Sequence, residues 1–284
     1  AYAKDRLQMR SLSGPKNPDG PADPIIVHPD VRRMLLTQKS IAEGGRAFVG
    51  YLAQLVDEVE HGTDEKLKAV AESKLALLTP IAKAFLTEVG FECTSHGVQI
   101  FGGHGFIKEW GMEQLMRDTR ISMLYEGTTG VQAIDLLGRK ILGSKGELIK
   151  PFAAEVMAFC QEHGTNDEMA EFIKPMISFG VKWQEMTKEI GMKAMTNPDE
   201  IGAASVDYLM YSGYMTLAYF WAKMAKVAQD ALANGTDEKP FYEAKIKTAQ
   251  FYFERILPRV KGHAACIKNG GESMMALAEG DFLF

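Results

Sequence analysis

Apolar residues recur every three to four positions through most of the 284-residue chain, with charged residues between them. This spacing is typical of amphipathic helices that turn one apolar stripe toward a core. One predicted helix starts near Pro29 and ends at His61–Gly62, and a second runs from about Asp64 toward Thr94. No segment alternates with period two between turn residues, so we predict an all-α fold built as an up-and-down helical bundle.

Further apolar stripes follow a short break at Gly143–Gly146 and predict an additional helical bundle. The stripes comprise Leu148, Phe152, Val156 and Phe159; Met169, Phe172, Met176, Trp183, Met186 and Ile190; Val206, Leu209, Leu217, Phe220, Trp221, Met224 and Val227; and a last element from Phe241 to Val260 that ends near Pro258. The break contains no long polar linker. We therefore predict two packed helical layers, residues 1–145 and 146–284. Pro, Gly and Asp crowd into residues 13–24 and predict a loop there.

Composition and charge exclude several classes of protein. The chain is 46% hydrophobic and 24% charged, and its formal net charge of -5 comes without a basic block. Binding to a nucleic acid depends on neutralising phosphates, so we expect no nucleic-acid partner. The six histidines lack metal-ligand spacing, and no apolar run reaches transmembrane length, so we expect neither a metal site nor a membrane span.

The cysteines and the first residue bear on the cellular location and on the extent of the protein. Cys93, Cys160 and Cys266 are far apart and odd in number, which disfavours a disulfide framework and indicates a reducing compartment. No signal peptide is visible, so we expect a cytoplasmic protein. The chain begins without Met on the pattern of a helix already under way, so we expect Ala1 to be a cut point.

The segment YEGTTGVQ, residues 125–132, has the most informative pattern for chemistry. Thr129 and Gln132 have the spacing of a capping box, so we expect Thr129 to cap the following helix. Glu126 would then precede a helix N-terminus, where the helix dipole lowers the pKa of a carboxylate and burial among residues 123–125 would raise it. Two interpretations stay open: a general base, or a solvated carboxylate that stabilises the dipole.

Two further features suit an anionic ligand. Within Gln99–Phe106, the pair Gly102-Gly103 lets backbone N–H groups approach a phosphate, although the same pattern fits a tight turn that ends a helix. Arg6, followed by Gln8, is the residue type that clamps a pyrophosphate through its guanidinium fork. An isolated arginine is more often only a surface residue.

Together these segments resemble a known family. Arg6…Gln8, VQIFGGHGF, QLMRDTRI and YEGTTGVQ occur in the order and at the separations found in the flavin-dependent acyl-CoA dehydrogenases. Residues 1–145 resemble the C-terminal helical domain of that family, and residues 146–284 resemble the extension of a longer bacterial subfamily. The family's N-terminal helical domain and middle β domain are absent from this chain. We therefore expect the chain to be a fragment that is inactive by itself.

The resemblance implies a role for each motif. Glu126 would remove the α-proton of an acyl-CoA thioester while the β-hydride passes to flavin N5, and Tyr125 and Gly127 would lie against this substrate. The residues implied to hold FAD are Arg6, Gln8, Gln99, Gly102, Gly103, Thr128 and Gly130. In this family the Gly-Gly turn usually serves the FAD of the neighbouring subunit, which implies a homo-oligomer, a dimer or a tetramer. The expected electron acceptor is an electron-transfer flavoprotein.

Two positions depart from the family pattern. Met9 stands where many members have Phe, and Gly130 stands where many have Gln, which implies that some flavin contact is altered or is supplied by another residue. Two other functions stay open from the sequence: an acyl-CoA oxidase that uses oxygen, and a helical oligomerisation module without catalysis.

Overall fold

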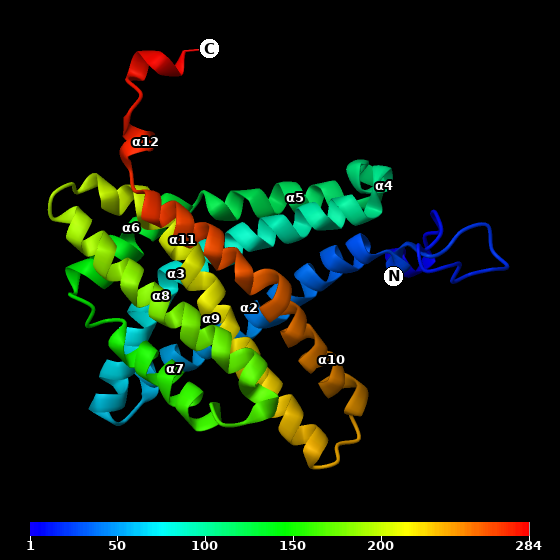
Figure 1. Cartoon of the computed structure of the whole chain (residues 1–284), viewed down its shortest axis with the longest axis horizontal. Helices are drawn as coiled ribbons and strands as arrows, with labels where there is room; N and C mark the ends of the chain where they lie inside the picture. The colour runs from blue at the N-terminus through cyan, green and yellow to red at the C-terminus, as the bar shows by residue number, and fades with distance from the viewer. Residues whose placement is uncertain (284) are drawn as a thin grey trace. The chain divides into compact units, whose positions relative to one another are not determined.

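The computed structural model describes residues 1–283, and every regular element among them is helical (Figure 1). The α-helices are α1 (Tyr2–Asp5), α2 (Pro29–His61), α3 (Glu65–Phe101), α4 (Gly103–Phe106), α5 (Met112–Arg120), α6 (Thr129–Ile134), α7 (Lys150–His163), α8 (Ala170–Ala194), α9 (Asp199–Ala233), α10 (Lys239–Phe251), α11 (Val260–Asn269) and α12 (Glu272–Met275). Short 3-10 turns cover Ile25–Val27, Lys108–Trp110, Ile121–Met123, Asp167–Met169, Leu257–Arg259 and Glu279–Phe282, and π-helical segments cover Asp135–Gly143 and Tyr252–Ile256. An isolated antiparallel bridge between Leu7 and Pro24 is the one extended pairing in this range. The all-α prediction is confirmed.

The chain forms two compact units, which are described one at a time. The first unit contains residues 1–43 and 87–125, and the second contains residues 44–86 and 126–284. The division at residue 145 that the sequence suggested stays a prediction.

The first unit is built on a small apolar core. That core consists of Ala3, Ile25, Met34 and Ile100. The ring of Tyr2 stacks on that of Phe101, with 4.1 Å between the centroids and 13° between the planes. This contact fixes the start of the chain against the end of α3.

The end of α3 differs from the sequence-based expectation. The helix was expected to run only toward Thr94, but it continues through Gly97 to Phe101. A Cβ atom at Gly97 would lie 2.5 Å from Cε of Met112, so the glycine makes room for the first residue of α5. Gly97 therefore serves close packing inside a helix and does not end it.

The second unit is organised around α9. From Tyr208 to Trp221 this helix carries no charged residue, and a helix that is apolar all round requires neighbours on every side. α8, α10, α11 and α6 all contact it, and Figure 1 shows α8, α9 and α11 side by side. Six aromatic residues of this part of α9 are buried: Tyr208, Tyr211, Tyr214, Tyr219, Phe220 and Trp221.

Two glycines bring α2 and α3 close to α9 within the second unit. A Cβ atom at Gly213 of α9 would lie 2.1 Å from Cγ of Phe85, and one at Gly44 of α2 would lie 2.7 Å from Nε1 of Trp221. Real side chains do not tolerate such approaches, so both contacts require glycine.

The chain near Pro258 also differs from the expectation. The last stripe was expected to form one element ending near Pro258, yet the chain stays helical and continues into α11. Pro258 lies in the first turn of the 3-10 segment that follows the π-helical segment, where its missing N–H is tolerated.

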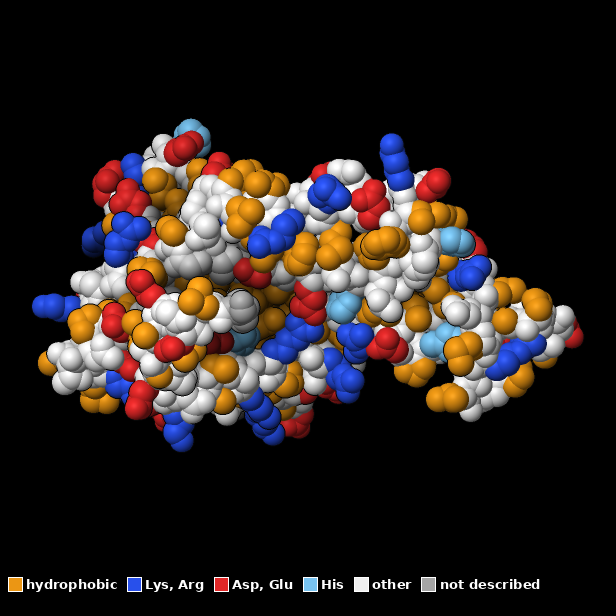
Figure 2. Space-filling view, turned by 90° about the horizontal axis from the view of Figure 1, so that it is seen from above, with side chains coloured by type: hydrophobic (Ala, Val, Ile, Leu, Met, Phe, Trp, Pro, Cys, Tyr) orange, Lys and Arg blue, Asp and Glu red, His pale blue; other side chains and the backbone are white. Residues whose placement is uncertain are grey.

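The surface carries charges of both signs. Figure 2 shows Lys and Arg side chains interspersed with Asp and Glu side chains on the face it presents. None of the helices within residues 1–283 is sufficiently long and apolar to cross a membrane.

Candidate functional site

The loop that carries Glu126 has a strained backbone. Glu126 adopts φ 54°, and Gly127 follows with φ 89°. The left-handed conformation costs a residue with a side chain roughly 1–2 kcal/mol, and such strain persists only where the surroundings impose it. The one acidic residue that the sequence singled out is thus also one of the few non-glycine residues with a positive φ.

The helix after this loop is capped by Thr128, and the expectation that Thr129 caps it was wrong. Thr128 has an extended conformation, and its side-chain oxygen accepts a hydrogen bond from the N–H of Val131 at 3.4 Å. Thr129 is already the first residue of α6. Gln132 does reach back, but its Nε2 donates to the carbonyl oxygen of Glu126 at 3.0 Å and not to a cap N–H.

Two side chains hold the strained peptides of the loop. Besides the bond from Gln132, Nζ of Lys83 on α3 donates to the carbonyl oxygen of Gly127. A Cβ atom at Gly127 would lie 2.7 Å from Nε2 of Gln132, so this position requires glycine for space as well as for its φ. The sequence gave no indication of Lys83, because it lies 44 residues before the carbonyl it binds.

The carboxylate of Glu126 is exposed in this chain. Its neighbours Leu124 and Tyr125 are 48% and 54% exposed, so the expected burial among residues 123–125 does not occur within the chain. The reason is local: α6 starts three residues after Glu126, and the buried residues here are Ala133 of α6 and Leu136 of the π-helical segment that follows it, not those of the loop. Tyr125, Glu126 and Thr128 therefore present their side chains at the surface.

The other implied ligand-binding residues gather in one groove of the first unit. The groove has a volume of about 590 Å³, and its lining includes all five residues from the Arg6 segment and the Gly-Gly turn: Arg6, Gln8, Gln99, Gly102 and Gly103. Gly102 adopts φ 60° and ψ −137°, a conformation open only to glycine. No atom lies within 4 Å of a Cβ atom built at Gly102 or Gly103, so the backbone is open on that side.

Three polar side chains in this groove suit an anion, and the carboxylate of Asp30, which also lines it, forms an ion pair with Arg33. Within residues 1–283, the side chains of Arg6, Gln8 and Gln99 make no hydrogen bond or ion pair, so their donors are available to phosphate oxygens. Met9, the departure from the family pattern, also lines the groove, and it is 72% exposed with φ 60°.

Tyr2 and His104, which line the groove, belong to an aromatic cluster. The ring of His104 stacks on Trp110, with 4.7 Å between the centroids and 10° between the planes. The hydroxyl of Tyr2 lies 2.9 Å from Nδ1 of His104. The cluster therefore sets the orientation of the one imidazole that follows the Gly-Gly turn.

Asp23 organises the loop that carries Gln8 and Met9. Its backbone N–H donates to the carbonyl of Met9 and its carbonyl accepts from the N–H of Gln8, each at 2.9 Å. Its buried carboxylate accepts from the N–H groups of Ser11, Lys16 and Asn17 at 2.7–2.8 Å.

A pKa far below the ordinary value follows from these bonds. The bond from the Ser11 N–H contributes most, burial opposes it, and bonds from Asn17, Lys16 and Arg10 complete the decrease in the pKa of Asp23 from 3.8 to about 2. The carboxylate is therefore ionised wherever the protein functions, and it holds the loop that the sequence predicted for residues 13–24.

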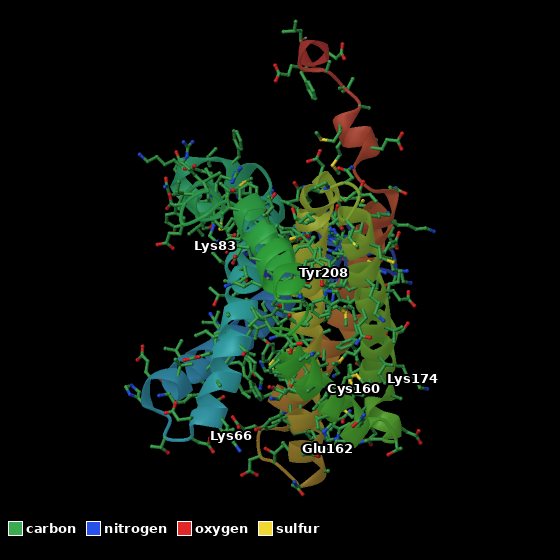
Figure 3. All side chains as sticks on the ribbon, turned by 90° about the vertical axis from the view of Figure 1, so that its left-hand side faces the viewer. Lys66, Lys83, Cys160, Glu162, Lys174 and Tyr208 are labelled. Atoms are coloured by element: carbon green, nitrogen blue, oxygen red, sulfur yellow. The ribbon has the colours of Figure 1, made fainter. Side chains whose placement is uncertain are left out.

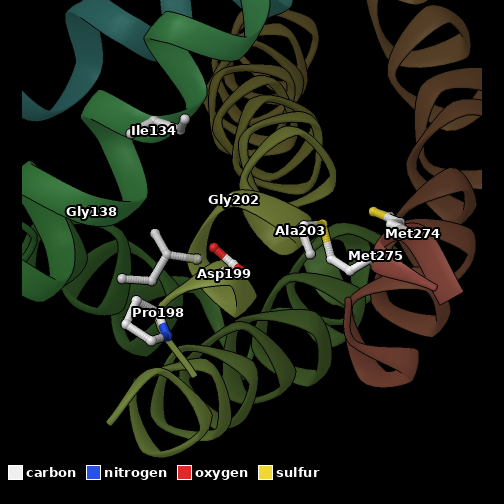
Figure 4. A pocket seen from close by; sticks show the side chains of 9 residues that line it. Ile134, Gly138, Pro198, Asp199, Gly202, Ala203, Met274 and Met275 are labelled. Atoms are coloured by element: carbon white, nitrogen blue, oxygen red, sulfur yellow. The ribbon is translucent and has the colours of Figure 1, made fainter. Parts of the chain in front are cut away.

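A second hollow lies in the second unit, and the sequence did not indicate it. It has a volume of about 580 Å³ between the helical segment 134–138, the start of α9 and α12. Figure 4 shows that Ile134, Ala203 and Met275 give it an apolar lining in which Asp199 is the one charged side chain. It brings together no set of groups for catalysis.

Comparison with known proteins connects both parts of the chain to one family. Residues 16–142 match the family described as "Acyl-CoA dehydrogenase, C-terminal domain", and residues 152–278 match "Acetyl-CoA dehydrogenase C-terminal like". The chain is 37% identical to 3-methylmercaptopropionyl-CoA dehydrogenase of Ruegeria pomeroyi, over 97% of this chain and 46% of that protein. It is 32% identical to the broad-specificity linear acyl-CoA dehydrogenase FadE5 of Mycobacterium tuberculosis, over 99% of this chain and 48% of that protein. The chain thus spans about half the length of the curated relatives it matches.

Solved structures show the same fold. An acyl-CoA dehydrogenase complexed with FAD from Bacillus anthracis matches with a TM-score of 0.67 at 19% identity, over 99% of this chain and 46% of the other. Caenorhabditis elegans ACDH-11 in complex with C11-CoA matches with a TM-score of 0.70 at 19% identity, over 92% of this chain and 42% of the other. By its sequence, matched over residues 16–142 and 152–278, this chain belongs to the C-terminal part of the acyl-CoA dehydrogenase family.

Proposed function

We propose that the protein carrying this chain is an FAD-dependent acyl-CoA dehydrogenase that introduces an α,β double bond into an acyl-CoA thioester. The named relatives support this proposal, and so does the FAD complex of the Bacillus anthracis neighbour. In this proposal residues 1–145 are the family's C-terminal helical domain and residues 146–284 its extension. The protein is cytoplasmic, assembles as a homodimer or larger homo-oligomer, and passes its electrons to an electron-transfer flavoprotein.

The observation that carries the proposal is the geometry of Glu126. An exposed carboxylate on a mobile loop has no fixed direction, but this one stands on a left-handed residue whose carbonyl is bound by Gln132. A base that removes a weakly acidic C–H proton must be held in a fixed position against its substrate. We assign to Glu126 the removal of the α-proton, and to Tyr125 and Gly127 contact with the acyl-CoA.

The residues of the first unit suit the cofactor. FAD, when bound, accepts the β-hydride. Arg6 and the open backbone at Gly102 and Gly103 suit a pyrophosphate, and Gln8 and Gln99 offer additional donors. On the Glu126 side, Thr128 keeps its hydroxyl proton for donation while its oxygen caps α6, and Gly130 leaves open space beside it.

The test is Glu126→Gln in the complete protein. The amide keeps the shape of the side chain and removes its basicity, so the variant should retain the flavin absorbance and lose bleaching by acyl-CoA. Glu109→Gln, a change at another exposed glutamate, is the control and should bleach normally. Near-normal dye reduction by the Glu126→Gln protein would show that another group is the base, and oxygen uptake by the wild type would indicate an oxidase.

A further inference from the structure

The half-buried ammonium group of Lys83 has no part in the function proposed above. Lys83 lies on α3, and its side chain forms no ion pair with a carboxylate among residues 1–283. Its hydrogen bond goes instead to an uncharged backbone oxygen, that of Gly127. A charged donor makes a stronger hydrogen bond than a neutral one. The carbonyl group of Gly127 is therefore held more strongly than it would be by a neutral donor.

The loop needs such a bond at that peptide. Glu126 and Gly127 are consecutive left-handed residues, and a non-glycine residue in this conformation relaxes unless surrounding groups prevent it. Gln132 binds the first of the two carbonyls and Lys83 binds the second. The two donors come from different helices, α6 and α3, so the loop is tied both to its own helix and to a neighbouring one.

The bond from Gln132 ties the loop only to the helix that the loop itself starts. Gln132 lies in the helix that the loop itself starts, so its bond moves together with α6. Lys83 lies on a 37-residue helix whose neighbouring residues Ile81 and Phe85 are fully buried. Lys83 therefore ties the loop directly to α3, in addition to the tie that runs through α6 and its packing against α9.

We propose that Lys83 is a positioning residue for Glu126: its bond to Gly127 holds the carboxylate in the direction that proton removal requires. That Glu126 removes a proton is part of the proposed function, and this inference rests on it. That Lys83 holds the loop follows from the geometry alone. Lys83 itself does not touch substrate and exchanges no proton in the reaction.

The experiment compares Lys83→Met with Lys66→Met in the complete protein. Methionine is an unbranched side chain only one atom shorter than lysine, and it removes the donor. Lys66 is an exposed lysine near the start of the same helix, and Figure 3 shows it far from Lys83 along α3. Lys83→Arg restores a charged donor and serves as the conservative variant.

The first measurement is amide hydrogen exchange without substrate, followed on peptides that cover residues 125–132. The N–H groups of Val131 and Gln132 both bind Thr128, so loosening the loop should speed their exchange by about tenfold, the effect of losing one hydrogen bond to a charged donor. Lys66→Met should exchange like the wild type, and Lys83→Arg should recover most of the protection. Unchanged exchange in Lys83→Met would overturn the proposal.

The second measurement is steady-state turnover across pH. Misplacement of a catalytic group by about 1 Å costs on the order of 100-fold in rate, so kcat of Lys83→Met should fall by about 10- to 100-fold with KM little changed. The pH profile should keep its shape, because Lys83 donates no proton to the reaction. Faster exchange with an unchanged kcat would overturn the positioning role. A wild type that leaves every acyl-CoA unchanged would refute the proposed function, while the exchange data would still decide whether Lys83 holds the loop.

Discussion

The hydroxyl of Tyr219 on α9 donates a hydrogen bond to Oε1 of Glu155 on α7, with 2.7 Å between the two oxygens. Tyr51 of α2 donates to Oε2 of the same carboxylate at 2.6 Å, and Nζ of Lys74 on α3 also binds Oε2. One carboxylate therefore joins four helices of the second unit. Two of these helices precede residue 145 in the chain and two follow it.

Glu155→Gln should lower the free energy of unfolding by about 1–3 kcal/mol, because it leaves the ammonium of Lys74 without its counter-charge and turns an amide N–H₂ toward a phenol donor. Denaturation in urea measures the loss. Glu162→Gln, at an exposed glutamate of the same helix, should change stability by less than about 0.5 kcal/mol (Figure 3). Equal stability of the two variants would show that this half-buried network contributes nothing to stability.

The same network predicts a pH dependence. Burial alone would raise the pKa of Glu155, but the hydrogen bonds from Lys74, Tyr51 and Tyr219 outweigh it, and the pKa lies below the ordinary 4.5. A pKa lowered by folding stabilises the fold above the unfolded pKa, and that contribution disappears as the pH falls through the folded pKa. The stability difference between wild type and Glu155→Gln should thus be constant at neutral pH and shrink below about pH 4.5. A difference that grows on acidification would contradict this origin.

Asp23→Asn should loosen the loop beside the groove, because an amide cannot accept from three N–H groups and a guanidinium at once. Trypsin should then cut after Arg10 and Lys16 faster than in the wild type, and the complete protein should retain less FAD. Asp19→Asn, in the same loop at an exposed aspartate, is the control and should behave like the wild type. The folded pKa of Asp23 is lowered to about 2, so the wild-type loop should resist acid until the pH falls from 3.8 toward that value. Identical digestion of the two variants would argue against Asp23 as the organiser.

Glu126→Gly should be more stable than Glu126→Ala by roughly 0.5–1 kcal/mol. Glycine relieves a left-handed strain of about 1–2 kcal/mol, and its greater freedom in the unfolded chain offsets part of that gain. Both variants lack the carboxylate, so the comparison isolates the backbone at φ 54°. Thermal unfolding of the two proteins measures it. Equal midpoints would mean that the loop relaxes around any side chain at this position.

The helices were predictable from the sequence because their apolar positions repeat. Met34, Ile41, Phe48 and Leu55 are spaced by seven and are all buried on α2. Glycine was harder to interpret, because its meaning depends on what approaches it. The helix expected to run toward Thr94 continues past Gly97, because this glycine makes space for Met112, a neighbour that only the tertiary structure supplies.

At the candidate site, too, the sequence revealed local motifs but not contacts between residues far apart in the chain. The motifs identified Glu126 and the Gly-Gly turn, because glycine and a carboxylate leave local patterns. They could not identify Lys83 or Glu155, because the partners of these residues lie 44 and 64 or more residues away and each looks in the sequence like an ordinary charged position between apolar ones. The cap at Thr128 was missed by one position, because two adjacent threonines offer the same hydroxyl and only the backbone conformation separates them.

A nick after Lys145 should leave residues 1–145 and 146–284 associated. Lys145 is exposed, has φ 54° and lies in the turn between the π-helical segment and α7, so a sequence-specific protease site inserted there should be cut without disturbing a helix. The two pieces share the second unit: Glu155 binds Tyr51 and Lys74 across the cut, and Phe85 packs against Gly213.

The nicked protein should elute as one species in native buffer and as two in concentrated urea. Introducing Glu155→Gln should lower the urea concentration at which the pieces separate, whereas Glu162→Gln should not. Spontaneous separation in native buffer would show that the chain consists of two independent halves, each with a complete core of its own.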